Sequence, residues 1–284
     1  MKRDLSVIAA LGVLLSPMLA GAINVGETSF ETTHNQVRQD VDAENRYHFT
    51  RQATYLYTDF LEGDDATTLG IETDAAFGIG NIHTRHIMYL ELADYPRIIP
   101  GKYTNPDVTE PDAFEEETGI TDLLTGFWFS KNKEEHHALE IGYGLGLQLP
   151  TASDDSLGTG KWSAGPSIDI EYKKGNFFCG TILIQLWDFA GDDDRKDVNS
   201  LIMKYFLMYD LNKHWKLISI PYGITYYWKK PSDEALSIPV GGGVQRNLHW
   251  GKQEFSLHLQ AFKNVVRPSK GSEGDVRLTL EWYF

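Results

Sequence analysis

The sequence contains a single cysteine, Cys179, among 284 residues. An intrachain disulfide is therefore impossible, and the fold must be held by packing and hydrogen bonds alone. After the first 22 residues, no stretch reaches the ~20 apolar residues that a membrane-spanning helix needs. If the chain enters a membrane, we expect a closed β-barrel, because open sheet edges are not tolerated in lipid.

Positive charge is also scarce, with 26 Lys and Arg against 40 Asp and Glu and a formal net charge of −14. Nucleic-acid-binding proteins need a basic footprint, so we expect no nucleic-acid partner. The spacing of a phosphate-binding loop or a calcium loop is missing, and no serine stands in a recognisable nucleophile context. We therefore expect no cofactor and no enzymatic activity.

The amino-terminal residues have the pattern of an export signal. Lys2 and Arg3 precede an apolar run at residues 5–15, and small residues follow at 20–22. This pattern predicts a secretory signal peptide over residues 1–22 rather than a buried helix, since no polar face is patterned on it. Residues 23–46 are polar, and they are expected to form a periplasmic lead-in, a segment inside the lumen, or simply a flexible terminus.

The carboxy-terminal ten residues alternate strictly. Apolar side chains fall on one face and mostly polar ones on the other, as in a strand. Ten residues ending in an aromatic suit a tilted transmembrane β-strand. The apolar face also resembles the signal by which barrel-assembly machinery recognises outer-membrane barrels. It consists of Val276, Leu278, Leu280, Trp282 and Phe284.

Similar alternation recurs along residues 47–284 and predicts about twelve strands. The expected strands are 47–60, 67–79, 83–94, 119–131, 137–149, 162–173, 176–188, 198–210, 214–228, 236–247, 252–265 and 274–284. In the ninth, Ile218 and every second residue up to Trp228 are expected on one face. Pro166, Pro221 and Pro239 fall inside these strands, so bulges are expected there.

The connections alternate between short and long. The short ones are 80–82, 132–136, 174–175, 211–213 and 248–251. The long ones are 61–66, 95–118, 150–161, 189–197, 229–235 and 266–273. Short periplasmic turns and long outer loops are typical of an antiparallel transmembrane β-barrel, whereas an exported β-sandwich has no reason to alternate in this way. We therefore predict an all-β barrel in the bacterial outer membrane, in contact with lipid and lipopolysaccharide.

Three segments carry a resemblance to a known family. They are LGTGKWSAGP at 157–166, following Leu149-Pro150-Thr151, then PVGGGV at 239–244 and AFKNVVRP at 261–268. With the aromatic carboxy terminus, they resemble the outer-membrane transporter family of the phenol meta-degradation pathway. The resemblance covers residues 47–284 and departs from the family at the acidic segment 110–117. It implies a channel for hydrophobic or aromatic molecules and supplies no catalytic residues.

The residues on the polar parity are the candidates for lining a lumen and setting its selectivity. They are Glu72, Asp74, Glu140, Asp169, Glu171, Lys204, His258, Arg277 and Glu281. Carboxylates outnumber bases, so a conducting lumen should favour cations or neutral solutes. The sequence leaves a plug of salt bridges as the alternative, although the glycines between residues 140 and 148 favour an open path.

Two other functions stay open. A structural or adhesive protein would use acidic loops such as Glu115 to Glu117 and Asp192 to Asp194, which we interpret as solvated charge. A barrel hydrolase would use His258. The histidines that could suggest a metal site are His83 and His86, and the adjacent pair His136 and His137. The adjacent pair point to opposite faces if they lie in a strand, so they are not expected to share a metal ion.

Overall fold

The structure is a computed structural model that describes residues 47–61, 65–95, 117–131, 138–251, 253–269 and 271–284. The predicted signal peptide and lead-in lie outside this part. The described elements are all strands: β1 (His48–Phe60), β2 (Asp65–Ile79), β3 (Ile82–Tyr95), β4 (Glu117–Ile120), β5 (Leu123–Lys131), β6 (Leu139–Leu149), β7 (Lys161–Lys174), β8 (Phe177–Gly191), β9 (Asn199–Asp210), β10 (Trp215–Ser219), β11 (Ile224–Tyr227), β12 (Leu236–Trp250), β13 (Gln253–Val266) and β14 (Gly274–Tyr283).

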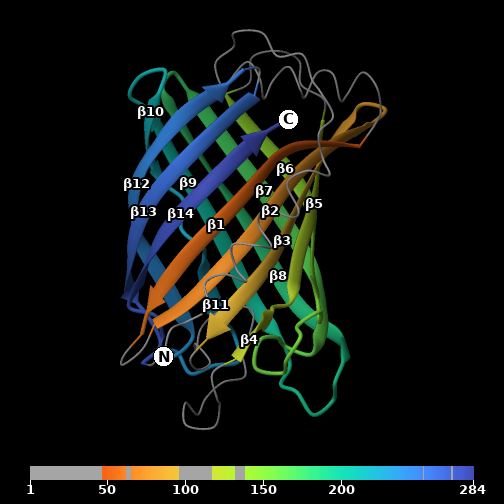
Figure 1. Ribbon diagram of the computed structural model, residues 1–284. Helices are drawn as coiled ribbons and strands as arrows, with labels where there is room; N and C mark the ends of the chain where they lie inside the picture. The colour runs from red at the N-terminus through yellow and green to blue at the C-terminus, as the bar shows by residue number, and fades with distance from the viewer. Residues whose placement is uncertain (1–46, 62–64, 96–116, 132–137, 252, 270) are drawn as a thin grey trace.

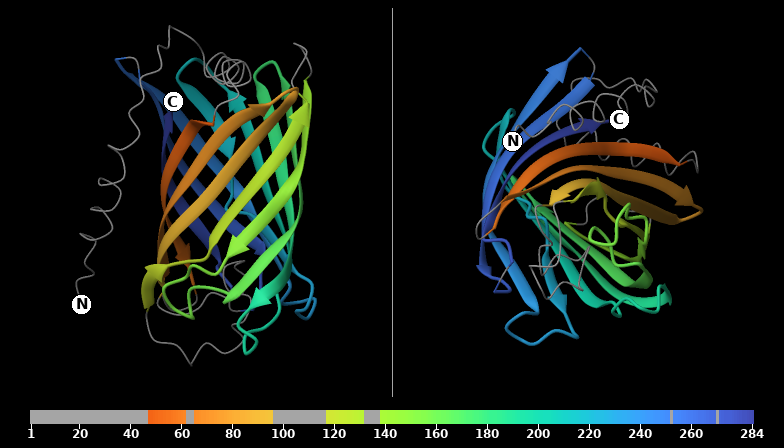
Figure 2. Two further views of the ribbon diagram at one scale, coloured as in Figure 1. Left: turned by 90° about the vertical axis from the view of Figure 1, so that its right-hand side faces the viewer. Right: turned by 60° about the horizontal axis from the view of Figure 1, so that its bottom comes forward.

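These strands close into one antiparallel barrel (Figures 1 and 2). Strand β1 pairs with β2 on one side and with β14 on the other, so the first and last strands seal the wall. Strands β4 and β5 share one position beside β3, and β10 and β11 share one position between β9 and β12. The result is the predicted closed barrel of twelve strand positions.

Among the described residues, no helix is long and apolar enough to cross a lipid bilayer.

The two ends of the barrel differ in their connections. One end, here called the short-turn end, carries the turns at residues 80–81, 175–176 and 211–214, and the chain ends there (Figure 1). The other, the long-loop end, carries residues 150–160, 192–198, 228–235 and 267–273. The described connections therefore have the predicted length asymmetry. The predicted connections 61–66, 95–118 and 132–136 lie wholly or mostly outside the described residues.

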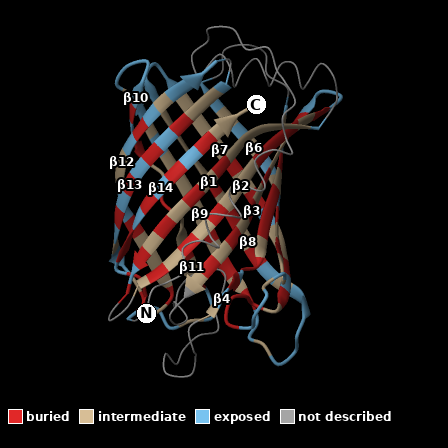
Figure 3. Cartoon of the chain, viewed as in Figure 1, coloured by how far each residue is buried: buried red, intermediate tan, exposed pale blue. Residues whose placement is uncertain are grey.

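Side chains alternate between the two surfaces of the wall, as the banding in Figure 3 shows. On β14, Val276, Leu278 and Leu280 are 42–47% exposed, whereas Arg277 and Glu281 are only 7% and 5% exposed. On this strand the wall is thus apolar outside and polar inside. Exposed apolar surface of this extent is unfavourable in water at ~25 cal/mol per Å², so the exterior suits hydrocarbon.

Two predicted strands are broken. The strand expected at 119–131 is interrupted at residues 121–122, and the one expected at 214–228 is interrupted at 220–223. Ser219 pairs with Leu207 and Ile224 with Met203, so residues 220–223 lie opposite only 204–206. The extra residue forms a bulge. Beyond it, the residues that would have faced outward face inward, and the reverse.

This reversal corrects the predicted face. Ile218 is buried and faces inward, yet beyond the bulge Thr225 and Tyr227 are the buried side chains. Pro221 lies within the break, where it has no backbone N–H to donate. Pro239 coincides with a register shift between β12 and β13, as expected of a proline in a closed sheet.

The segment at 157–166 has a structural role at the long-loop end. The backbone N–H and the hydroxyl of Thr159 both donate to Asp122 Oδ2, each over 2.7 Å. Gly160 has φ +66°, which favours glycine. Arg195 from the next long loop donates to the Gly158 carbonyl at 2.6 Å. The segment therefore clamps two long loops against the break between β4 and β5.

Candidate functional site in the barrel interior

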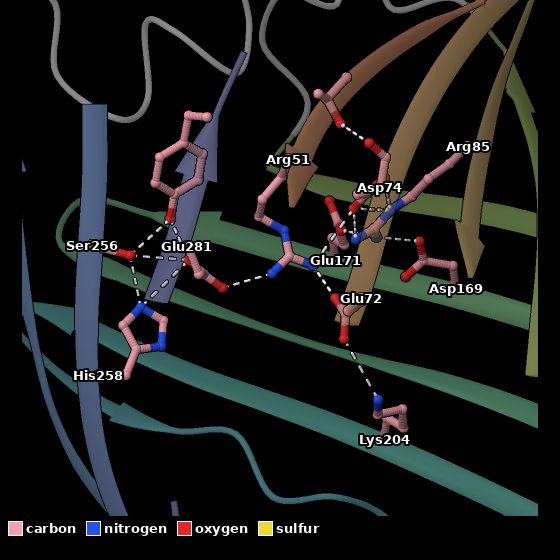
Figure 4. Close-up of polar contacts among 12 residues, drawn as sticks. Arg51, Glu72, Asp74, Arg85, Asp169, Glu171, Lys204, Ser256, His258 and Glu281 are labelled. Atoms are coloured by element: carbon pink, nitrogen blue, oxygen red, sulfur yellow. Dashed lines mark hydrogen bonds and ion pairs between the residues drawn. The ribbon is translucent and has the colours of Figure 1, made fainter. Parts of the chain in front are cut away.

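A band of charged side chains crosses the barrel interior (Figure 4). We call it the waist. It comprises Arg51, Glu72, Asp74, Arg85, Asp169, Glu171, Lys204 and Glu281. Six strands supply these side chains, so the waist can form only once the barrel has closed.

Arg85 is the most highly connected cation of the waist. From β3 it donates to Asp74 Oδ2 at 2.8 Å on the neighbouring strand β2. It also reaches Asp169 Oδ2 at 2.8 Å and Glu171 Oε1 at 2.7 Å on β7, across β5 and β6. One guanidinium therefore ties three carboxylates together, and such charge-assisted bonds are the strongest hydrogen bonds in proteins.

Arg51 extends the same chain of ion pairs to the other side. It donates to Glu281 Oε1 on β14 at 2.6 Å and to Glu72 on β2, and it lies 3.8 Å from Asp74 Oδ2. Lys204 Nζ approaches Glu72 Oε2 to 3.7 Å. Since β9 and β2 lie half-way round the strand order from each other, this ion pair spans the barrel.

A second crossing joins β3 to the break between β10 and β11. Tyr222 donates its hydroxyl to Glu91 Oε2 at 2.8 Å, and Tyr55 donates to Glu91 Oε1 at 2.8 Å. The Arg277 guanidinium lies 4.9 Å from the centre of the Tyr57 ring. These strands too are on opposite sides, so polar contacts close the interior at two places.

An apolar cluster of inward-facing side chains fills the interior along β3, β5, β8, β9 and β11. The fully buried members include Ile87, Leu124, Trp128, Ile184, Leu186 and Ile202. This cluster corrects the expectation that the β6 glycines widen the lumen. A Cβ on Gly146 would lie 2.2 Å from Ile184, and one on Gly142 would lie 3.2 Å from Trp128. The glycines make room for packed side chains instead.

A small cavity of about 20 Å³ adjoins the waist, lined by His83, Arg85, Glu140, Asp169 and Glu171 among others. This volume is enough for about one water molecule. A solute-sized site at this point would require the waist to rearrange.

All nine predicted lumen residues lie on the interior parity of their strands. Six belong to the waist, His258 contacts it, Glu140 lines the small cavity and Arg277 joins the second crossing. Their role in selectivity stays a prediction. Sequence reasoning missed Arg51 and Arg85, although each shares its strand parity with interior tyrosines. These two cations reduce the acidic excess on which the selectivity prediction relied.

Ser256 stands beside His258, although the sequence around it does not have a recognisable nucleophile context. Ser256 Oγ lies 2.8 Å from His258 Nε2, because residues two apart share a strand face. Glu281 Oε2 lies 3.4 Å from the same nitrogen and 3.1 Å from Ser256 Oγ. A catalytic triad needs the carboxylate on the other ring nitrogen, so this arrangement lacks the hydrolytic relay.

The metal candidates give no cluster. His83 faces inward, whereas His86 stacks on Phe127 with ring centres 4.2 Å apart. Within the described ranges, no group of three or more His, Cys, Asp or Glu side chains could hold a metal ion. His136, His137, Glu115 and Glu116 lie outside those ranges.

Solved structures similar to this chain include outer-membrane channels and porins. The COG4313 outer membrane channel from Pseudomonas putida F1 aligns with a TM-score of 0.57 and 12% identity, covering 93% of this chain and all of the other. The fold is that of an outer-membrane barrel. The KdgM porin aligns with a TM-score of 0.42, 12% identity and coverage of 82% and 99%.

The outer membrane phospholipase A from Escherichia coli aligns with a TM-score of 0.45 and 11% identity, covering 87% of this chain and 98% of that one. No family profile matches this chain, and no curated protein matches it in sequence.

Proposed function

We propose that this protein is a passive outer-membrane channel for small molecules and that the waist is its selectivity filter. One observation carries the proposal: ion pairs, rather than packed apolar side chains, cross the barrel at the waist. Buried ion pairs are weak evidence for stability, since apolar replacements are often equally or more stable. Ionisable groups at membrane depth are by default candidates for a solute pathway.

The solute that fits best is small and either neutral or cationic. In the waist, five carboxylates face the three cations Arg51, Arg85 and Lys204, which leaves an acidic excess. Such a field lowers the local concentration of anions. The resemblance to the phenol meta-pathway transporters adds hydrophobic or aromatic molecules to this class. A phenol should therefore pass more readily than a benzoate.

Conductance in planar bilayers tests the proposal, with the full chain reconstituted at neutral pH. The change Tyr222→Ala removes the crossing to Glu91 and should raise the single-channel conductance above that of the wild type. The matched control is Tyr226→Ala. Tyr226 lies four residues further along, in β11, where its side chain points outward and packs on Trp228. It should leave the conductance unchanged. Silence of both the wild type and Tyr222→Ala would overturn the channel proposal in favour of a structural or adhesive protein.

A further inference from the structure

The ammonium group of Lys204 is held by tyrosine rings and carboxylates rather than by hydrogen bonds. Its Nζ lies 3.7 Å from the centre of the Tyr89 ring and 5.9 Å from that of the Tyr222 ring. Figure 4 shows the side chain reaching toward Glu72, whose Oε2 is 3.7 Å away, too far for a hydrogen bond. No described residue accepts a hydrogen bond from this ammonium. Proteins bind alkylated ammonium ligands in the same way, on the faces of aromatic rings.

The strand register builds the near side of this site. Glu72 on β2 is paired with Tyr89 on β3, and Glu91 lies two residues further along β3 on the same inward face. Gly70 is paired with Glu91 on one side and with Tyr55 on the other. A Cβ on Gly70 would lie 2.2 Å from the Tyr55 ring, so this glycine lets the ring cross β2 and donate to Glu91 at 2.8 Å. The sequence therefore places a ring and two carboxylates together.

Tyr222 completes the site from the opposite side of the barrel. It belongs to the break between β10 and β11, and its hydroxyl donates to Glu91 Oε2 at 2.8 Å. We call Glu72, Tyr89, Glu91 and Tyr222 the cage. Tyr89 and Glu91 are buried, whereas the side chains of Glu72 and Lys204 are 16% and 15% exposed. The occupant of the cage is thus largely shielded from water and can still be reached.

Arg277 repeats the arrangement on the same tyrosine surface. Its Cζ lies 4.9, 5.7 and 5.9 Å from the ring centres of Tyr57, Tyr222 and Tyr55. It is only 7% exposed, and its Nε and Nη2 have no hydrogen-bond acceptor among the described residues, although Asp275 Oδ1 is 3.6 Å away. Two buried cations therefore lie against these rings without hydrogen bonds. The surface recognises a positive charge on an organic group.

We propose that the cage is a binding site for organic ammonium ions and that Lys204 is its tethered occupant while the waist is closed. The inference deepens the proposed channel function, on which its role rests, by naming the solute class. Arg51 and Arg277 repel the charge of Lys204, and Glu72 stays paired with Arg51 when Lys204 leaves. An incoming ammonium ion can therefore replace Lys204 on the ring. A neutral solute gains no such cation–π attraction, and the carboxylates repel an anion.

The cage is tested by removing its occupant. Lys204→Ala removes the atoms that n-propylammonium would restore, and n-propanol is a neutral control of similar size. Calorimetric titration of the folded full chain in detergent should show propylammonium binding to Lys204→Ala about tenfold more tightly than propanol, as expected of a desolvated cation–π contact. Binding to the wild type should be weaker, because Lys204 competes. Lys204→Ser, which leaves nearly the same space, repeats the measurement in a second variant.

Matched variants separate the cage from general binding. Lys204→Met fills the cage with a neutral side chain and should abolish the binding. In the Lys204→Ala background, Tyr89→Leu should weaken propylammonium binding about tenfold. Tyr143→Leu should not change it, because Tyr143 is 65% exposed on the outside of the barrel. Heat-modifiability on gels checks that each variant folds. Equal affinities for propylammonium and propanol, or an affinity that Tyr89→Leu leaves unchanged, would overturn the cage.

Planar bilayers separate this proposal from the channel proposal. In the conducting wild type, reversal potentials with propylammonium on one side and sodium on the other should show that propylammonium is the more permeant ion, and Tyr89→Leu should reduce its advantage. Propylammonium binding by a protein that stays silent would support the cage and refute the channel. Conductance without propylammonium binding to folded Lys204→Ala would refute the cage and leave the channel intact.

Discussion

Arg85 offers a stability prediction whose size follows from the structure. The change Arg85→Met keeps most of the side-chain length and removes the guanidinium that binds Asp74, Asp169 and Glu171 within 2.7–2.8 Å. The Arg85 side chain is 16% exposed and the three carboxylates are 6–13% exposed. Removing one partner of a buried ion pair costs about 3–5 kcal/mol, because the remaining charges stay buried.

An exposed ion pair with a similar N–O distance provides the control. Arg267 lies 2.8 Å from Glu273 in a long loop, with side chains 28% and 56% exposed. Because solvent screens this pair, Arg267→Met should cost only ~0–1 kcal/mol. The two substitutions make the same chemical change at nearly equal distances. The difference between them reflects burial together with the larger number of carboxylates that Arg85 binds.

Equilibrium unfolding in urea, followed by tryptophan fluorescence in lipid vesicles, measures both costs from midpoint and slope. A triple variant, Arg85→Met with Asp169→Asn and Glu171→Gln, should recover most of the lost stability, since the carboxylates no longer need a cation. Equal destabilisation by Arg85→Met and Arg267→Met would refute the view that the waist is a desolvated ion-pair cluster.

Three further predictions concern assembly, selectivity and catalysis. Deleting Phe284 should lower outer-membrane levels on fractionation without changing an interior contact, and normal levels would contradict the proposed assembly signal. Reversal potentials under a salt gradient should show a preference for cations, to which the outer acidic loops contribute within the Debye length of ~8 Å. Lys204→Gln should strengthen this preference because it removes a cation from the waist, and a preference for anions would disprove it. The wild type should hydrolyse neither lipid nor peptide, so an activity that His258→Ala abolishes would restore the hydrolase hypothesis.

Most of the fold was predictable from local pattern. Strict alternation on β6 and β14 determines which side chains face outward. The loop lengths determine which end of the barrel carries the short turns and which carries the long loops. The early strands were harder, because β2 places Thr67 and Thr73 on the same outward parity as Leu69 and Ile71. Where both faces of a strand carry polar residues, the sequence does not show which alternate residues face the interior. For this reason Arg51 and Arg85, on the flanking strands, escaped notice.

The contents of the interior could not be predicted in the same way. Gly142 and Gly146 indicate space on β6, but the side chains that fill it come from β5 and β8. Likewise, Pro221 predicts a defect in its strand without indicating that one extra residue would reverse the faces beyond it. Both outcomes depend on register between strands, which a single sequence does not encode locally.

A waist closed by ion pairs differs physically from a plug of apolar side chains. Opening an apolar plug such as the cluster around Trp128 exposes its surface to water, and the free energy rises with every Å² uncovered. Parting Lys204 from Glu72, already 3.7 Å apart, lets water reach both charges, and their rehydration offsets part of the lost attraction. The ion pairs of the waist are therefore contacts that water can replace. For that reason we infer that a closed waist and a passive channel are compatible in one structure.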